Sequence, residues 1–171
     1  MKKEAPPPEP WLRGTLGEIP AVARAVLHAL ELAKEDLQKW CGGLADEELS
    51  ARPANLPPVA FHLRHIARSI DRLLTYAEGG VLTGEQIAAL KSELELGARS
   101  GEVFAELLAG LERGAERIRA LSQHDLSAQR LVGKRQLPTS LAGLLVHVAD
   151  HTQRHVGQAV TTAKVVMSLR N

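Results

Sequence analysis

Apolar residues recur at intervals of three and four along most of the chain, and polar residues fill the positions between them. This spacing is typical of amphipathic helices, because residues three or four apart lie on one helical face. No segment shows the strict alternation of apolar and polar residues that indicates a half-buried strand. The pattern predicts helices from about Ile19 to the glycines at 42–43, and over residues 59–78, 83–96, 101–121 and 141–167, with a short helical turn at 46–52.

Local signals support the predicted helix ends. Pro20 suits the first turn of the first helix, and the glycines at 79–80 end the second. Thr83 and Gln86 have the spacing of a capping box. Residues 136–139, which end in Thr139, are expected to cap the last helix, and the segment before it, 122–138, is predicted to be a loop.

Four substantial helices joined by modest connectors predict an all-α fold, an antiparallel four-helix bundle. The connectors at 52–58 and 122–138 are the longest, and they permit an order other than simple up-down-up-down. Residues 1–12, with four prolines among the first ten and no periodicity, are expected to form a disordered or extended lead-in. A single helical domain would then cover residues 13–171.

Charge and composition exclude several classes of partner. The 21 basic and 20 acidic residues nearly balance, which argues against duplex DNA or an anionic membrane surface as a partner. No apolar run is long enough to span a membrane, and the N-terminus has no apolar signal segment. Cys41 is the one cysteine, so no internal disulfide can form, and we interpret it as a small buried residue. A cytoplasmic protein is expected.

The histidines carry the candidate chemistry. His147, His151 and His155 follow one another at four-residue intervals on the last predicted helix. On a helical wheel, His151 and His155 point into the apolar face, whereas His147 lies at its edge. Two buried histidines need polar partners, and a shared metal ion satisfies both at once. Hydrogen-bonded core histidines are the alternative. Zinc, nickel or iron would accept imidazole ligands.

The second predicted helix can supply a third ligand. His62 and His65 lie three residues apart on the flank of its apolar stripe. On the same helix, Arg64, Arg68 and Arg72 form a basic stripe that is either solvated or an anchor for an anionic substrate. Three further titratable residues are interpreted as surface groups: His28, His124 and Asp150. The Glu-x-x-His pairs of di-iron bundles, the His-Glu-x-x-His motif and phosphate-binding glycine loops do not occur.

Two segments resemble one known family. FHLRHIARSIDRLLTYAEG at 61–79 and DHTQRHVGQ at 150–158 are similar to the motif helices of the DinB/YfiT-like superfamily. The resemblance implies a metal-binding four-helix bundle of unusual connectivity, often a homodimer. It also implies that His65, His151 and His155 bind a divalent metal, with His65 preferred over His62 because it directly precedes an aliphatic residue. Gly157 would allow close helix packing. His62 and Gln158 are candidates for side chains that contact the ligands.

The same resemblance implies an activity on small molecules. Relatives include thiol-dependent S-transferases, an isomerase that uses low-molecular-weight thiols, and proteins assigned as metal-dependent hydrolases. We therefore expect an enzyme whose metal-bound water or thiol is the reactive group, acting in S-transfer or hydrolysis. No protein side chain is singled out as catalytic. The alternative is a non-catalytic binding or stress-response module that the metal stabilises.

Overall fold

The computed structural model describes residues 7–94 and 99–170, and these are mainly helical, as the hydrophobic pattern predicts. The four long helices are α1 (Ala21–Cys41), α3 (Val59–Ala77), α5 (Ser100–Leu121) and α6 (Leu141–Ser168). Two shorter helices, α2 (Asp46–Ser50) and α4 (Gly84–Lys91), lie in the connections. Turns of 3₁₀ helix occupy Pro10–Leu12 and Pro53–Asn55, and a hairpin joins β1 (Gln129–Val132) to β2 (Leu137–Ser140).

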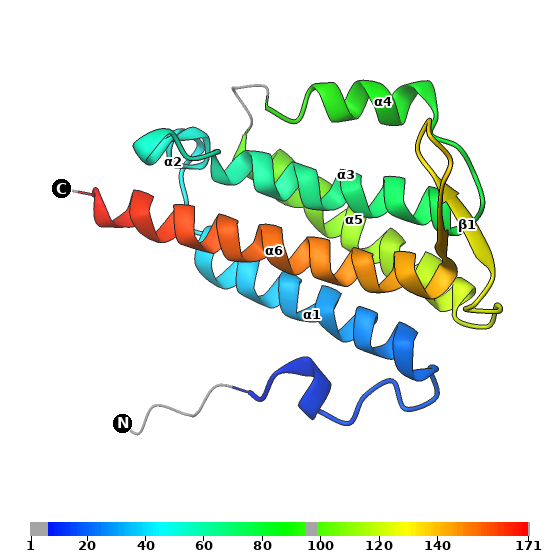
Figure 1. Cartoon of the computed structure of the whole chain (residues 1–171). Helices are drawn as coiled ribbons and strands as arrows, with labels where there is room; N and C mark the ends of the chain where they lie inside the picture. Colours follow the sequence, from blue (N-terminus) through cyan, green and yellow to red (C-terminus); the bar gives the residue numbers. More distant parts are fainter. Residues whose placement is uncertain (1–6, 95–98, 171) are drawn as a thin grey trace.

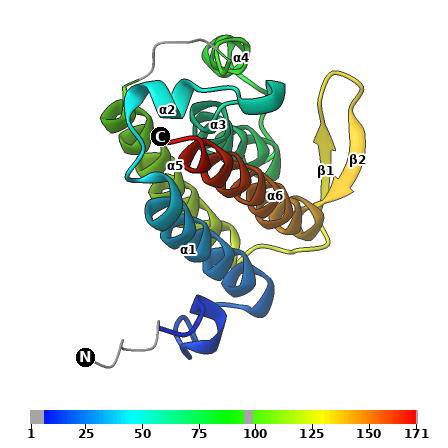
Figure 2. The same ribbon diagram turned by 90° about the vertical axis from the view of Figure 1, so that its left-hand side faces the viewer.

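The four long helices pack side by side around one apolar core (Figures 1 and 2). Helix α6 packs against both α1 and α3, and α5 packs against α3 and, less extensively, α1. Two contacts show the direction of α6 relative to α1: the Gln153 side chain donates to the Ala29 carbonyl, and, further along both helices, the Lys164 ammonium lies over the Trp40 ring. Helices α1 and α6 are therefore parallel.

Helices α3 and α5 are also parallel, because Ala67 faces Gly110 and Ile70 faces Gly114. By contrast, α3 and α6 run antiparallel (Figure 1). The expected antiparallel arrangement thus holds for α3 and α6 but is wrong for two other neighbouring pairs. Parallel neighbours require a crossover, and the chain returns from the end of α3 to the start of α5 through the segment that contains α4 (Figure 1). This crossover, rather than the connectors at 52–58 and 122–138, permits the unusual order.

Several predicted boundaries hold and others need correction. Thr83 and Gln86 make both hydrogen bonds of the predicted capping box. The helix that they start ends at Lys91 instead of Leu96, and residues 95–98 lie outside the described part of the chain. The cap of α6 is Ser140, whose hydroxyl accepts from the Gly143 amide at 3.0 Å, rather than the predicted capping segment that ends in Thr139.

The predicted loop at 122–138 contains most of the β-hairpin, so the expectation of no strands is wrong. Each strand has four residues, and none of these residues is fully buried. Leu131 pairs with Pro138, which lacks an amide hydrogen and is tolerated because the strand lies at a sheet edge. Such short, exposed strands carry too little hydrophobic alternation to be recognised, and the proline resembles loop punctuation.

The N-terminal segment contacts α1 where the structure describes it. Residues 1–6 of the predicted lead-in are outside the described part, and Pro10–Leu12 forms a 3₁₀ turn instead of an extended chain. Arg13 then pairs with Glu35 of α1 at 2.6 Å. Across residues 7–94 and 99–170, no helix has the length and apolar character needed to cross a membrane.

Candidate metal centre

Three histidines meet between α3 and α6. The two helices pack against each other, and His65 of α3 faces the turn of α6 that carries His151 and His155. Those two residues are four apart, so their rings lie one above the other on the same helical face. Among the described residues, these three form a group that could hold a metal ion, with one ring nitrogen from each lying within 4.8 Å of the others. This is the group that the family resemblance implies, whereas the histidine pattern alone left His62 and His65 open.

The geometry of this group fits a divalent ion bound by nitrogen. The Nε2 atoms of His65 and His151 are 3.3 Å apart. Two imidazole nitrogens that bind one tetrahedral zinc ion at about 2.0–2.1 Å are separated by about 3.3–3.4 Å. The ring centroid of His155 lies 4.3 Å from that of His65 and 4.7 Å from that of His151. The three side chains thus present a donor set of a kind that zinc, nickel and iron accept.

The environment keeps two of these imidazoles neutral. Burial, followed by the charges of His155 and His65, lowers the pKa of His151 to about 4. Burial, followed by the charges of His65 and Arg154, lowers the pKa of His155 to about 4 as well. A neutral imidazole has a free lone pair, and metal binding therefore requires no loss of a proton from these rings at neutral pH.

His65 has a buried carboxylate partner that the sequence analysis missed. Its Nδ1 lies 2.7 Å from Oε2 of Glu93, and Nη1 of Arg72 donates to the other carboxylate oxygen at 2.8 Å. Burial by itself raises the pKa of Glu93, but the hydrogen bonds from His65 and Arg72 outweigh it and lower the pKa below its usual value. Glu93 follows α4 in the crossover and is only 4% exposed.

His62 contacts the three clustered histidines through His155. Its Nδ1 lies 3.1 Å from Nδ1 of His155, and the residue is 2% exposed. Burial, followed by the charges of His155 and His65, lowers the pKa of His62 to about 4. By contrast, Nδ1 of His151 is buried and has no hydrogen-bond partner among the described residues. His62 is thus placed as a neighbour of a candidate ligand.

The Gly157–Gln158 pair that follows His155 is exposed on α6. A Cβ atom added at Gly157 would meet nothing within 4 Å, so the expected role of Gly157 in close helix packing is wrong. Gln158 lines a cavity of about 640 Å³ that His62 and His155 border. Leu56, Pro57 and Phe61 contribute apolar surface to its lining, and Gln158 and Thr161 contribute polar groups. Phe61 also stacks on His65, with the ring centroids 5.3 Å apart.

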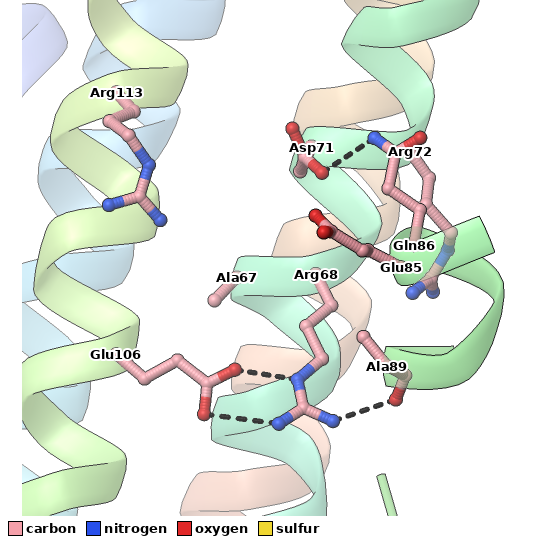
Figure 3. Close-up of a pocket in the computed structure, with 9 residues that line it drawn as sticks. All are labelled: Ala67, Arg68, Asp71, Arg72, Glu85, Gln86, Ala89, Glu106 and Arg113. Carbon is pink, nitrogen blue, oxygen red and sulfur yellow. Dashed lines mark hydrogen bonds and ion pairs between the residues drawn. The ribbon is translucent and has the colours of Figure 1, made fainter. Parts of the chain in front are cut away.

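The arginine stripe of α3 is not a solvated face. Arg68 donates to both carboxylate oxygens of Glu106 on α5 and to the Ala89 carbonyl of α4, as Figure 3 shows. Arg72 is 9% exposed and pairs with Glu93. These two arginines therefore fasten the crossover and α5 to α3. The small pocket drawn in Figure 3, of about 210 Å³, lies among these ion pairs, and no histidine lines it.

The other singled-out residues are distant from this chemistry or peripheral to it. His147 is exposed at the edge of α6, as predicted, and Asp150 is an exposed group that binds Arg154 at 2.9 Å. His28 was expected on the surface but is buried at 7% exposure, with its Nε2 3.1 Å from the Thr15 hydroxyl. Burial raises the pKa of the Cys41 thiol to about 12, which fits a structural residue.

Comparison with known families agrees with the motifs and with the geometry of the site. A search among curated proteins gave no match. The model of the DinB superfamily matches residues 29–159, a span that contains most of α1, all of α3 and α5, and the part of α6 that carries His151 and His155. This span is well over half of the 171 residues, and we conclude that the chain belongs to the DinB superfamily.

Proposed function

We propose that this protein is a metal-dependent enzyme that acts on a small molecule at the site formed by His65, His151 and His155. The observation that carries the proposal is the convergence of three ring nitrogens within 4.8 Å from two antiparallel helices. Three imidazoles would leave a coordination position for an exchangeable group, which distinguishes catalytic metal sites from filled structural ones. Zinc, nickel and iron are the candidate metals.

His65, His151 and His155 would hold the divalent ion, which would supply Lewis acidity that lowers the pKa of a water or thiol beside it. The protein's own contribution is to hold the ligands. In this proposal His62 fixes the ring of His155 through a hydrogen bond between their Nδ1 atoms, in which one ring donates its N–H to the other. The cavity beside His62 and His155 has a volume typical of a small-molecule site.

The proposed reaction is S-transfer from a low-molecular-weight thiol to an electrophile, or hydrolysis. Two features of the cavity support a small organic substrate. Leu56, Pro57 and Phe61 offer an apolar surface, and Gln158 in the same lining can contact a polar group. No carboxylate lines the described cavity, so an anionic substrate would meet no like charge there.

We further propose a homodimer, which sedimentation velocity would test.

The first test is metal content. Protein purified without a metal-affinity step should contain close to one divalent ion per chain, measured by mass spectrometry of the metals. His151→Ala should lose this ion. His147→Ala is the matched control, because His147 lies one turn earlier on α6 and outside the group. Metal content that is absent from the wild type, or equal in the two variants, would contradict the proposed site.

The second test is turnover. The metal-loaded protein is assayed with a panel of small thiols paired with electrophiles, and with ester and amide substrates. Activity that is lost in His65→Ala, with helical content by circular dichroism unchanged, supports the enzyme. A bound metal that raises the melting temperature, together with no turnover across the panel, favours the non-catalytic module instead.

A further inference from the structure

Glu93 is a buried acid with both oxygens engaged. One oxygen accepts from the Arg72 guanidinium at 2.8 Å, and the other lies 2.7 Å from Nδ1 of His65. The ion pair with Arg72 alone would compensate the buried charge. The contact with His65 is therefore an additional feature, and it connects the crossover directly to a candidate metal ligand.

The contact with Glu93 determines which ring nitrogen of His65 carries a hydrogen. A carboxylate has no hydrogen to donate, and the Arg72 pairing keeps Glu93 in this form, so Nδ1 of His65 must carry the shared hydrogen. When this imidazole is neutral, that hydrogen is its one N–H, and Nε2 keeps its lone pair. This Nε2 is the atom that faces His151 at 3.3 Å.

We infer that Glu93 is a positioning residue that holds His65 in the Nδ1–H tautomer and fixes its ring so that Nε2 points into the metal centre. The inference rests on the proposed function because it assigns His65 as a ligand. It extends that function to the crossover: Glu93, which lies 28 residues after His65 and outside both motif segments, would influence the affinity of the site.

A simpler role for Glu93 would be to fasten the crossover to α3. Arg68 already does this, because it donates to the Ala89 carbonyl at 2.7 Å, beside its ion pair with Glu106 (Figure 3). It also donates to the Ser92 hydroxyl at 3.0 Å. The crossover therefore has an anchor that does not involve Glu93. Replacing the Glu93 carboxylate should alter His65 while α4 stays docked.

The test compares Glu93→Gln with Glu106→Gln. Both variants remove one charge from an ion pair made by an α3 arginine, but Glu106 contacts none of the histidines in the described structure. Two-bond ¹H–¹⁵N correlation spectra of metal-free protein report the tautomer of each histidine. We expect the Nδ1–H form of His65 in the wild type and in Glu106→Gln. In Glu93→Gln the Nε2–H form should appear, because an amide NH₂ can donate to Nδ1.

Zinc affinity, measured by competition with a chromophoric chelator, is the second readout. Loss of a group that orients a metal-binding histidine typically weakens binding 10–100-fold, and we expect this for Glu93→Gln and less than a twofold change for Glu106→Gln. An unchanged affinity and tautomer in Glu93→Gln, or equal losses in the two variants, would overturn the inference.

The two proposals can fail separately. If the wild type binds no metal, the proposed function fails, while the spectra of metal-free protein still show whether Glu93 sets the tautomer of His65. If Glu93→Gln does not fold, the wild-type spectrum decides: an Nε2–H tautomer at His65 overturns the role of Glu93, and an Nδ1–H tautomer supports it.

Discussion

Acid should destabilise the metal-free protein through its buried histidines. His62 is 2% exposed, and its pKa in the folded chain is about 4, compared with 6.5 for an ordinary histidine. Between these two values the unfolded chain binds more protons than the folded one. The contribution of neutral His62 to stability is therefore fully present above about pH 6.5 and is lost as the pH falls from there to about 4.

The size of the effect follows from the two pKa values of His62. Between pH 7 and pH 5, the proton uptake of the unfolded chain at this one residue lowers the free energy of unfolding by about 2 kcal/mol. His151 and His155 act in the same direction, since the pKa of each is also lowered to about 4. Part of each pKa shift comes from repulsion among the clustered histidines themselves. The three residues together therefore lower the free energy of unfolding by less than three times the value for His62.

Urea unfolding of metal-free protein, followed by circular dichroism at pH 7 and pH 5, measures this loss. In His62→Leu the difference between the two pH values should shrink by about 2 kcal/mol. His124→Gln is the control, because His124 is exposed in the turn after α5 and contacts none of the clustered rings. A pH difference in His62→Leu that equals the wild-type value would refute the reasoning. If Leu is not tolerated at this position, His151→Gln tests the same effect.

Three further predictions concern packing and reactivity. Gly110→Ala places a Cβ 2.7 Å from Cβ of Ala67, so we expect a loss of about 1–3 kcal/mol in urea unfolding despite the better helix propensity of alanine. Gly157→Ala meets nothing within 4 Å and should gain about 0.5–1 kcal/mol, whereas a loss there would contradict the open surface of α6. Cys41 is buried, with a pKa of about 12, and should resist thiol reagents until urea unfolds the chain; rapid labelling of native protein would disprove its burial.

The helices could be predicted from the sequence because their signals are local. A 3.6-residue apolar period, the capping box at Thr83 and the glycines after α1 and α3 each act over a few residues and do not depend on the rest of the fold. The pairing of His151 with His155 is equally local, since one helical turn separates them. His65 was selected over His62 through the resemblance, and the structure brings His65 into the group and leaves His62 in contact with His155.

The sequence could not indicate Glu93, because its role depends on the parallel arrangement of α3 and α5. That arrangement obliges the crossover to return along α3, and only then does a residue after α4 reach Arg72 and His65. Periodicity places Glu93 on a predicted helix where an acid normally faces solvent. The same dependence explains the arginine stripe: its pattern left open whether Arg68 and Arg72 are solvated or bind an anionic substrate, yet their partners come from α5 and the crossover. A residue pattern within one helix cannot show which side chains another segment brings against it. Charged residues that orient a buried site, such as Glu93, can therefore be identified only once the folded structure is known.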